Sequence, residues 1–182
     1  MFYEFKQVVS LKAAGASDKE IRTKVLEDNL FQHTKQSSIR RGLPSIIRRA
    51  NVLDEILRRF VIEESFDVGK VINLYAIMKT DCLFFEFMDE VIAEKLKAND
   101  YSFEKKDINM YFTVKAEQDG NIAGWTETTI QKLKQVYKKI LLETGLIKDK
   151  KSGELNQLLI DERVKAHLIH IGEKQYVRAM GE

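Results

Sequence analysis

Six arginines between residues 37 and 59 are the side chains of this sequence best suited to bind an anion. They form three doublets in the stretch SSIRRGLPSIIRRANVLDEILRRF: Arg40 and Arg41, Arg48 and Arg49, Arg58 and Arg59. A guanidinium group presents a fork of donors that matches phosphate oxygens, and a protein core cannot take up so many of them unpaired. The neighbouring Ser37 and Ser38 add uncharged donors. The segment therefore predicts phosphate contact, and the alternative is a solvated helix flank that pairs with acidic residues of the same protein.

Lysines form a second basic cluster later in the chain. Residues 126–151 contain seven lysines and three acidic residues, an excess of +4, and residues 35–59 have an excess of +5, although the net charge of the chain is only +2. Such segregation indicates a surface with a basic side, where local charge sets the field that a polyanion meets. The residues predicted to contact DNA are Lys35, Arg40, Arg41, Arg48, Arg49, Arg58, Arg59, Lys132, Lys138, Lys139, Lys150 and Lys151.

The motifs of common catalytic sites are missing from the sequence. It contains no glycine-rich phosphate loop, nucleophile elbow, dinucleotide fingerprint or zinc-ligand cluster. His167 and His170 are three residues apart but have no further ligands nearby, and Cys82 is the only cysteine, so no internal disulfide can form. We expect no enzymatic activity, no metal, no cofactor and no small-molecule substrate.

Hydrophobic runs in the sequence are short. The longest uncharged one, VINLYAIM, is well below the ~20 residues of a membrane span. The N-terminus, MFYEFKQVVS, carries Glu4 and Lys6 and lacks the features of a signal peptide. We expect a cytoplasmic protein that does not interact with membranes.

The fold class predicted by the pattern is mainly α, because apolar residues recur at three and four positions and the chain has one proline and nine glycines. Ser17 and Glu20 have capping-box spacing, and Pro44 is expected to interrupt the arginine-rich helix. The predicted helices cover about residues 2–14, 18–28, 37–60 in two parts, 67–78, 81–96, 103–117 and 126–144. The segment 81–96 is expected to be the central core helix.

The segment GLIKDKKSGELNQLLI, which follows the glycine that ends the lysine-rich helix, alternates weakly around Ser152 and Gly153. It predicts a short β-hairpin with a basic tip, and a helix followed by such a hairpin is typical of a winged-helix module. The N-terminal pair of helices favours a plain αα-hairpin over a DNA reader, because residues 18–28 are acidic overall. Two helical subdomains are expected, residues 1–62 and 63–182.

Two blocks of the sequence resemble a known family. The segments AAGASDKEIRTKVLEDNLFQHTKQSSIRR and GWTETTIQKLKQVYKKILLETGLI are similar to BrxA, an accessory component of bacterial BREX phage-defence systems. The resemblance extends over most of the chain, from about residue 15 to 160, and rests on the order and spacing of the blocks. It implies a helical fold like that of the NusB antitermination factor, no catalysis, binding of double-stranded DNA, and other BREX proteins as partners.

The expected function is therefore non-catalytic binding of double-stranded DNA, mainly through phosphates, in a phage-defence assembly. Two alternatives stay open at this point. The basic residues could dock an acidic protein partner, or the chain could be an RNA-binding, NusB-like factor. RNA binding is less favoured because no aromatic platform stands out among the basic residues.

Overall fold

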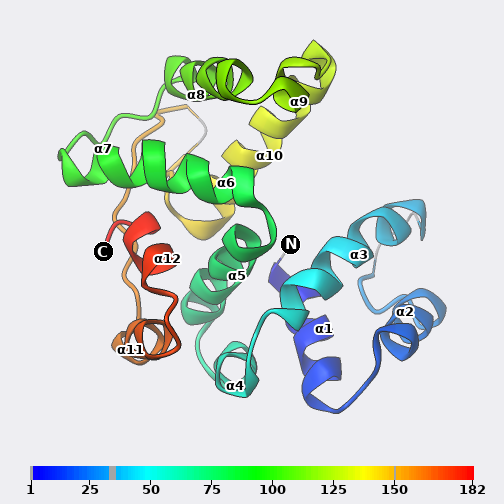
Figure 1. Cartoon of the computed structure of the whole chain (residues 1–182). Helices are drawn as coiled ribbons and strands as arrows, with labels where there is room; N and C mark the ends of the chain where they lie inside the picture. The colour runs from blue at the N-terminus through cyan, green and yellow to red at the C-terminus, as the bar shows by residue number, and fades with distance from the viewer. Residues whose placement is uncertain (1, 33–35, 150) are drawn as a thin grey trace. The chain divides into compact units, whose positions relative to one another are not determined.

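The computed structural model describes residues 2–32, 36–149 and 151–182, and these residues are mainly helical, as the sequence predicts (Figure 1). A π-helical segment, η1, lies between α6 and α7. The elements are α1 (Phe2–Ala13), α2 (Asp18–Glu27), α3 (Gln36–Asn51), α4 (Glu55–Glu63), α5 (Phe66–Thr80), α6 (Cys82–Phe87), η1 (Met88–Ala93), α7 (Glu94–Lys97), α8 (Lys105–Gln118), α9 (Gly120–Ala123), α10 (Glu127–Thr144), α11 (Glu162–His170) and α12 (Lys174–Ala179).

The chain divides into two compact units. Unit 1 contains the residues up to Asp81 together with Ile160–Val164, and unit 2 contains Cys82–Leu159 and Lys165–Glu182. The contacts thus separate between α5 and α6, whereas the subdomain boundary at residue 62 stays a prediction. Among the described residues, no helix is both long enough and apolar enough to cross a lipid bilayer.

Unit 1 is built around α5, which is buried on nearly all sides from Gly69 to Met78. α1 packs against α3, α4 and α5, and it contributes Phe5, Val8 and Val9 to the core. Gly69 lets these helices approach closely, because a Cβ at this position would lie 2.2 Å from the ring of Phe2. The core therefore holds α3 and α4 through their apolar sides and leaves their other sides to solvent.

The helix α3 runs without interruption from Gln36 to Asn51, so the predicted break at Pro44 is wrong. Pro44 has no N–H to donate to the carbonyl of Arg40, which costs one intrahelical hydrogen bond. Leu43, Ile46 and Ile47 are buried beside it, and their packing keeps the helix continuous through the proline position. The chain instead breaks after Asn51, and Asp54 caps the new helix α4 through a hydrogen bond from the Leu57 amide. The three arginine doublets therefore belong to two helices.

Unit 2 has an aromatic core. α6, η1 and α7 follow one another directly and bury Phe84, Phe87, Met88, Ile92 and Leu96, which agrees with the predicted central helix. The ring of Phe87 contacts those of Phe103, Tyr111 and Tyr137 at centroid distances of 6.0, 5.2 and 5.2 Å. These contacts join α6, α8 and α10 through packed aromatic rings.

The predicted C-terminal β-hairpin is not formed in the described part of residues 146–156, so the winged-helix expectation is also wrong. Gly145 ends α10 in the left-handed conformation at φ 82°, as a C-terminal glycine does. Beyond it, Ile147 and Leu155 form an isolated antiparallel bridge, and Ser102 and Glu154 form another. Glu154 thus pairs with the segment before α8 and Leu155 pairs with the segment after α10, and neither bridge extends into a strand.

Candidate nucleic-acid interface

The outward side of α3 carries three exposed arginines, Arg40, Arg41 and Arg48. Arg41 and Arg48 are two turns apart, so the continuous helix places them on the same side. None of the three makes an ion pair within the residues that the structure describes, and the Nε of Arg41 donates only to the Ser37 carbonyl, at 3.4 Å. Ser37 and Ser38 are exposed in the first turn of this helix. We call Arg40, Arg41 and Arg48 the α3 arginine face.

Arg49 does not belong to the candidate interface, because its side chain is buried. Only 6% of its surface is exposed, its Nε donates to the Ser45 carbonyl at 3.3 Å, and its Nη1 donates to Asn73 Oδ1 at 3.2 Å. This side chain links α3 to α5 inside unit 1. This burial could have been read from the helical pattern, since Arg49 lies between Ile46 and Ala50 on the buried side of the helix.

The doublet of α4 also divides into two environments. Arg59 is exposed, whereas Arg58 is half-buried, and its Nε is shielded from solvent and has no hydrogen-bond acceptor among the described residues. Arg59 can therefore meet an external anion and Arg58 can do so only with its outer nitrogens. Lys35 and Lys150, which were also predicted to contact DNA, lie outside the described residues.

In unit 2, the predicted lysines of α10 are all exposed. Lys132 has no ion pair among the described residues, and Lys139 lies 3.6 Å from the Glu143 carboxylate. The ammonium of Lys138 lies over the Phe103 ring at 5.9 Å from its centroid. Thr126 caps this helix by accepting from the Thr129 amide, which agrees with the prediction.

Lys138, Lys139 and Lys151 are brought together in one hollow of unit 2, which we call the lysine groove. Its volume is about 960 Å³, and its walls are α10, the start of α8 and the turn around residue 152. Lys105, a residue that the sequence analysis missed, lies on the same rim. It joins the cluster only through folding, because the Phe103 amide donates to the Gly153 carbonyl at 2.9 Å and brings the start of α8 to the turn. The lining residues are Phe103, Glu104, Lys105, Gln135, Lys138, Lys139, Leu142, Glu143, Ile147, Asp149, Lys151, Ser152 and Gly153.

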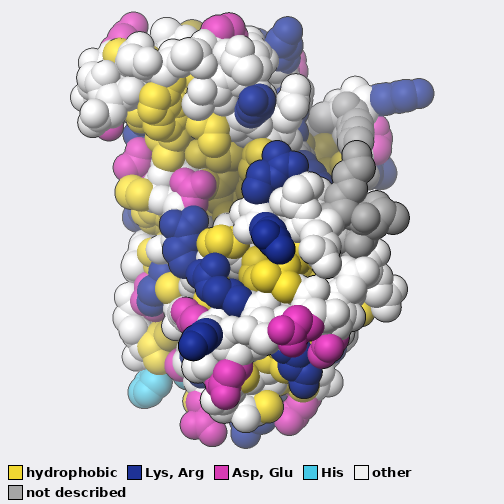
Figure 2. Space-filling model, turned by 90° about the vertical axis from the view of Figure 1, so that its right-hand side faces the viewer, with side chains coloured by type: hydrophobic (Ala, Val, Ile, Leu, Met, Phe, Trp, Pro, Cys, Tyr) yellow, Lys and Arg dark blue, Asp and Glu magenta, His cyan; other side chains and the backbone are white. Residues whose placement is uncertain are grey.

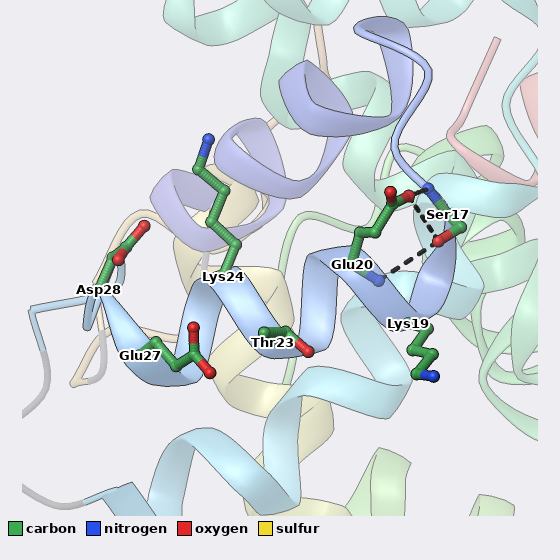
Figure 3. Close-up of a pocket in the computed structure, with 7 residues that line it drawn as sticks. All are labelled: Ser17, Lys19, Glu20, Thr23, Lys24, Glu27 and Asp28. Atoms are coloured by element: carbon green, nitrogen blue, oxygen red, sulfur yellow. Dashed lines mark hydrogen bonds between the residues drawn. The ribbon is translucent and has the colours of Figure 1, made fainter.

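A second hollow, along α2, does not have the character of an anion site. Figure 3 shows that its lining side chains come from one helix and its cap, and that Lys24, Glu27 and Asp28 do not point toward one another. Glu20 is occupied by the predicted capping box, in which its carboxylate accepts from Ser17 and the Ser17 hydroxyl accepts from the Glu20 amide. The hollow carries three carboxylates against two lysines, so its lining disfavours phosphate.

Figure 2 shows one face on which Lys and Arg side chains gather in groups with hydrophobic side chains exposed between them. His167 is half-buried and His170 is exposed, both on α11. No group of three or more His, Cys, Asp or Glu side chains suited to a metal ion occurs in the described ranges.

Comparisons with known proteins place this chain among described relatives. The family model BrxA matches residues 1–172. A BREX protein BrxA from Bacillus cereus (strain H3081.97) is 34% identical over 182 residues, which cover all of this chain and 87% of the relative. A second BREX protein BrxA, from Paramagnetospirillum magneticum (strain ATCC 700264 / AMB-1), is 22% identical over 97% of this chain and 89% of the relative.

A solved structure has a similar fold. The crystal structure of an uncharacterised protein from Magnetospirillum magneticum matches with a TM-score of 0.85 and 22% sequence identity. The match covers 98% of this chain and 92% of the other. At this identity the likeness concerns the fold alone.

Proposed function

Since the chain belongs to the BrxA family, we propose that it serves a BREX phage-defence system as a non-catalytic protein that binds double-stranded DNA through its phosphates. Other BREX proteins are its expected partners, because the relatives carry the name of that system. The NusB-like fold and a cytoplasmic location belong to the same proposal. Both are expectations from the sequence, and the expected fold comes from the family resemblance.

The observation that carries DNA binding is the α3 arginine face. Arg40, Arg41 and Arg48 are exposed on one helix, and none of them is neutralised by a carboxylate in the described structure. The three positive charges of the face repel one another. A polyanion that covers the face therefore lowers its electrostatic free energy. Guanidinium groups form paired hydrogen bonds with phosphate oxygens, which favours phosphate over other anions.

Double-stranded DNA is favoured over RNA or single-stranded DNA by the composition of this face. α3 contains no aromatic residue on which an unpaired base could stack. Its outward residues are arginines and serines, which bind sugar-phosphate backbones in any sequence. Binding is therefore expected to depend little on the DNA sequence.

A gel-shift titration tests this proposal directly. The wild-type protein is titrated against a random duplex, the matching single strand and an RNA hairpin of the same length, at one fixed salt concentration. We expect the duplex to bind most tightly, and we expect the double variant Arg41→Ala/Arg48→Ala to weaken duplex binding by about tenfold or more, as the loss of two phosphate contacts should. Tighter binding of RNA, or an unchanged affinity in the variant, would contradict the proposal.

The matched control removes the same charge from another helix of unit 1. Lys19→Ala/Lys24→Ala changes two exposed lysines of α2, and its duplex affinity should stay near that of the wild type. The non-catalytic part of the proposal has its own test. Supercoiled plasmid incubated with the protein and Mg²⁺ should remain uncut and unmodified.

A further inference from the structure

We propose that the lysine groove of unit 2 docks an acidic, amphipathic segment of a partner protein. This inference goes beyond DNA binding and does not rest on it, because it uses residues of α8, α10 and the 149–153 turn rather than the α3 arginine face. It takes up the adaptor alternative that the sequence left open. Three properties of the groove support it: preformed walls, an apolar floor and a rim on which three of the lysines have no ion pair within the described residues.

The wall that contains Asp149, Lys151, Ser152 and Gly153 is held by hydrogen bonds among these residues. Asp149 accepts from the Lys151 amide at 2.7 Å, the Ser152 amide at 2.9 Å and the Ser152 hydroxyl at 2.8 Å. Gly153 has a φ of 61°, and a Cβ there would lie 2.3 Å from the Phe103 carbonyl oxygen. The turn therefore approaches α8 at a position that accepts only glycine. The groove is a feature of the folded chain and does not need a ligand to form it.

The floor of the groove is apolar. Phe103, Leu142 and Ile147 line it, and the ammonium of Lys138 lies over the Phe103 ring at 5.9 Å from its centroid. A hydrophobic strip of this kind binds the apolar side chains of an amphipathic helix or extended segment. It offers no donors to a phosphate backbone, whose oxygens would lose their hydration above carbon atoms.

The rim supplies the charge complementarity. Lys105, Lys138 and Lys151 are exposed and have no carboxylate partner in the part of the chain that the structure describes. The acidic residues of the lining are already engaged: Glu104 pairs with Lys106 at 3.1 Å, Glu143 pairs with Lys139 at 3.6 Å, and Asp149 holds its own turn. Uncompensated positive charge around an apolar floor matches a segment whose glutamates or aspartates flank its hydrophobic side chains.

Fluorescence anisotropy with the full chain tests the proposal. The probe is a fluorescein-labelled synthetic helix of about 18 residues, with leucines on one stripe and glutamates elsewhere. We expect saturable binding, weakened about tenfold by Lys138→Glu and by Lys151→Glu. A peptide with serine in place of leucine should also bind at least about tenfold more weakly, because it cannot use the floor. Lys174→Glu, an exposed lysine of unit 2 outside the groove, is the control and should bind like the wild type.

Each alternative result has a defined meaning. Equal weakening by Lys174→Glu and Lys138→Glu would show charge attraction without a site and would overturn the proposal. The same holds if no saturable binding occurs or if the serine peptide binds as well as the leucine peptide. If an unlabelled duplex displaces the probe, and Lys138→Glu weakens duplex binding as much as probe binding, the groove belongs to the DNA interface instead. Circular dichroism of each variant confirms that it is folded.

Discussion

At the scale of single residues, neighbouring arginines of this protein have different roles. Arg48 is exposed and without an ion pair among the described residues, whereas Arg49 is buried and bonded to Asn73. Successive residues of a helix point about 100° apart, so one doublet reaches both solvent and core. A doublet in the sequence therefore does not guarantee two contacts with DNA.

The buried link gives a stability prediction. Arg49→Ala should lower the free energy of unfolding by about 1–3 kcal/mol, because it leaves the Asn73 side chain without its donor in a buried place. Arg48→Ala should change that free energy by less than about 0.5 kcal/mol, as exposed substitutions usually do. Urea unfolding followed by circular dichroism measures both. Equal effects of the two variants would show that Arg49 has no structural role.

A second prediction concerns Lys115 and pH. Burial lowers the pKa of this lysine, but hydrogen bonds to the carboxylates of Glu86 and Glu90, each at 2.7 Å, outweigh burial and raise the pKa above its ordinary 10.5. A pKa that is higher in the folded state contributes stability that is complete below the ordinary value and is lost as pH rises through the folded value.

Comparison with Lys115→Met isolates this contribution. The difference in unfolding free energy between wild type and variant should be larger at pH 9 than at pH 12, because the lysine of the unfolded chain loses its proton above its ordinary pKa of 10.5 and the advantage of the folded pairing then shrinks. Urea titrations at the two pH values measure the difference. A difference that stays constant with pH would mean that the ion pairs add nothing.

At the scale of the elements, the same substitution has opposite effects in two helices. Gly69 in α5 faces the Phe2 ring of α1 so closely that an added Cβ would lie 2.2 Å from it, whereas Gly42 in α3 has nothing within 4 Å. At Gly69, packing between helices determines how an alanine would change the stability. At Gly42, helix propensity determines it.

Gly69→Ala should therefore destabilise unit 1 by about 1–3 kcal/mol through overpacking. Gly42→Ala should stabilise it by about 0.5–1 kcal/mol, since alanine restricts the unfolded chain and meets no neighbour. Thermal unfolding of the two variants checks the signs. Stabilisation by Gly69→Ala would contradict the close packing of α1 against α5.

At the scale of the whole molecule, the two basic clusters belong to different compact units, and a shared DNA surface stays a prediction. Among the residues predicted to contact DNA, the exposed arginines of unit 1 are Arg40, Arg41, Arg48 and Arg59, and α10 of unit 2 adds Lys132. If one duplex contacts both units, the released counterions should add up across them.

The slope of log K against log salt concentration measures this sum. Four arginine contacts predict a slope of about −3 to −4, and each contact from unit 2 should make it steeper by about 0.9. Arg41→Ala/Arg48→Ala should make the slope shallower by up to about 2. Adding Lys132→Ala should make the slope shallower by about 1 more. If adding Lys132→Ala leaves the slope unchanged, Lys132 of unit 2 does not contact the DNA. A sequence-dependent loss at constant slope would instead indicate base reading.

The sequence by itself determined the helical class, most helix boundaries and the residues that could bind an anion. Apolar periodicity, the capping box of Ser17 and Glu20, and the glycine that ends α10 are local signals, because each acts within one or two turns. The family was also readable from two blocks of sequence, and the match over residues 1–172 confirms it.

Only the tertiary structure decided which basic residues are available and what surrounds them. Packing keeps α3 continuous through Pro44 and buries Arg49 against Asn73. Glu154 pairs with Ser102 and Leu155 pairs with Ile147, so the predicted hairpin does not form in the described residues. Folding also brought Lys105 to the lysines of α10 across more than 30 positions of sequence. The physical reason is the same in each case. Burial and hydrogen bonds between distant segments outweigh local preferences of about 1–3 kcal/mol, and no window of sequence contains both partners.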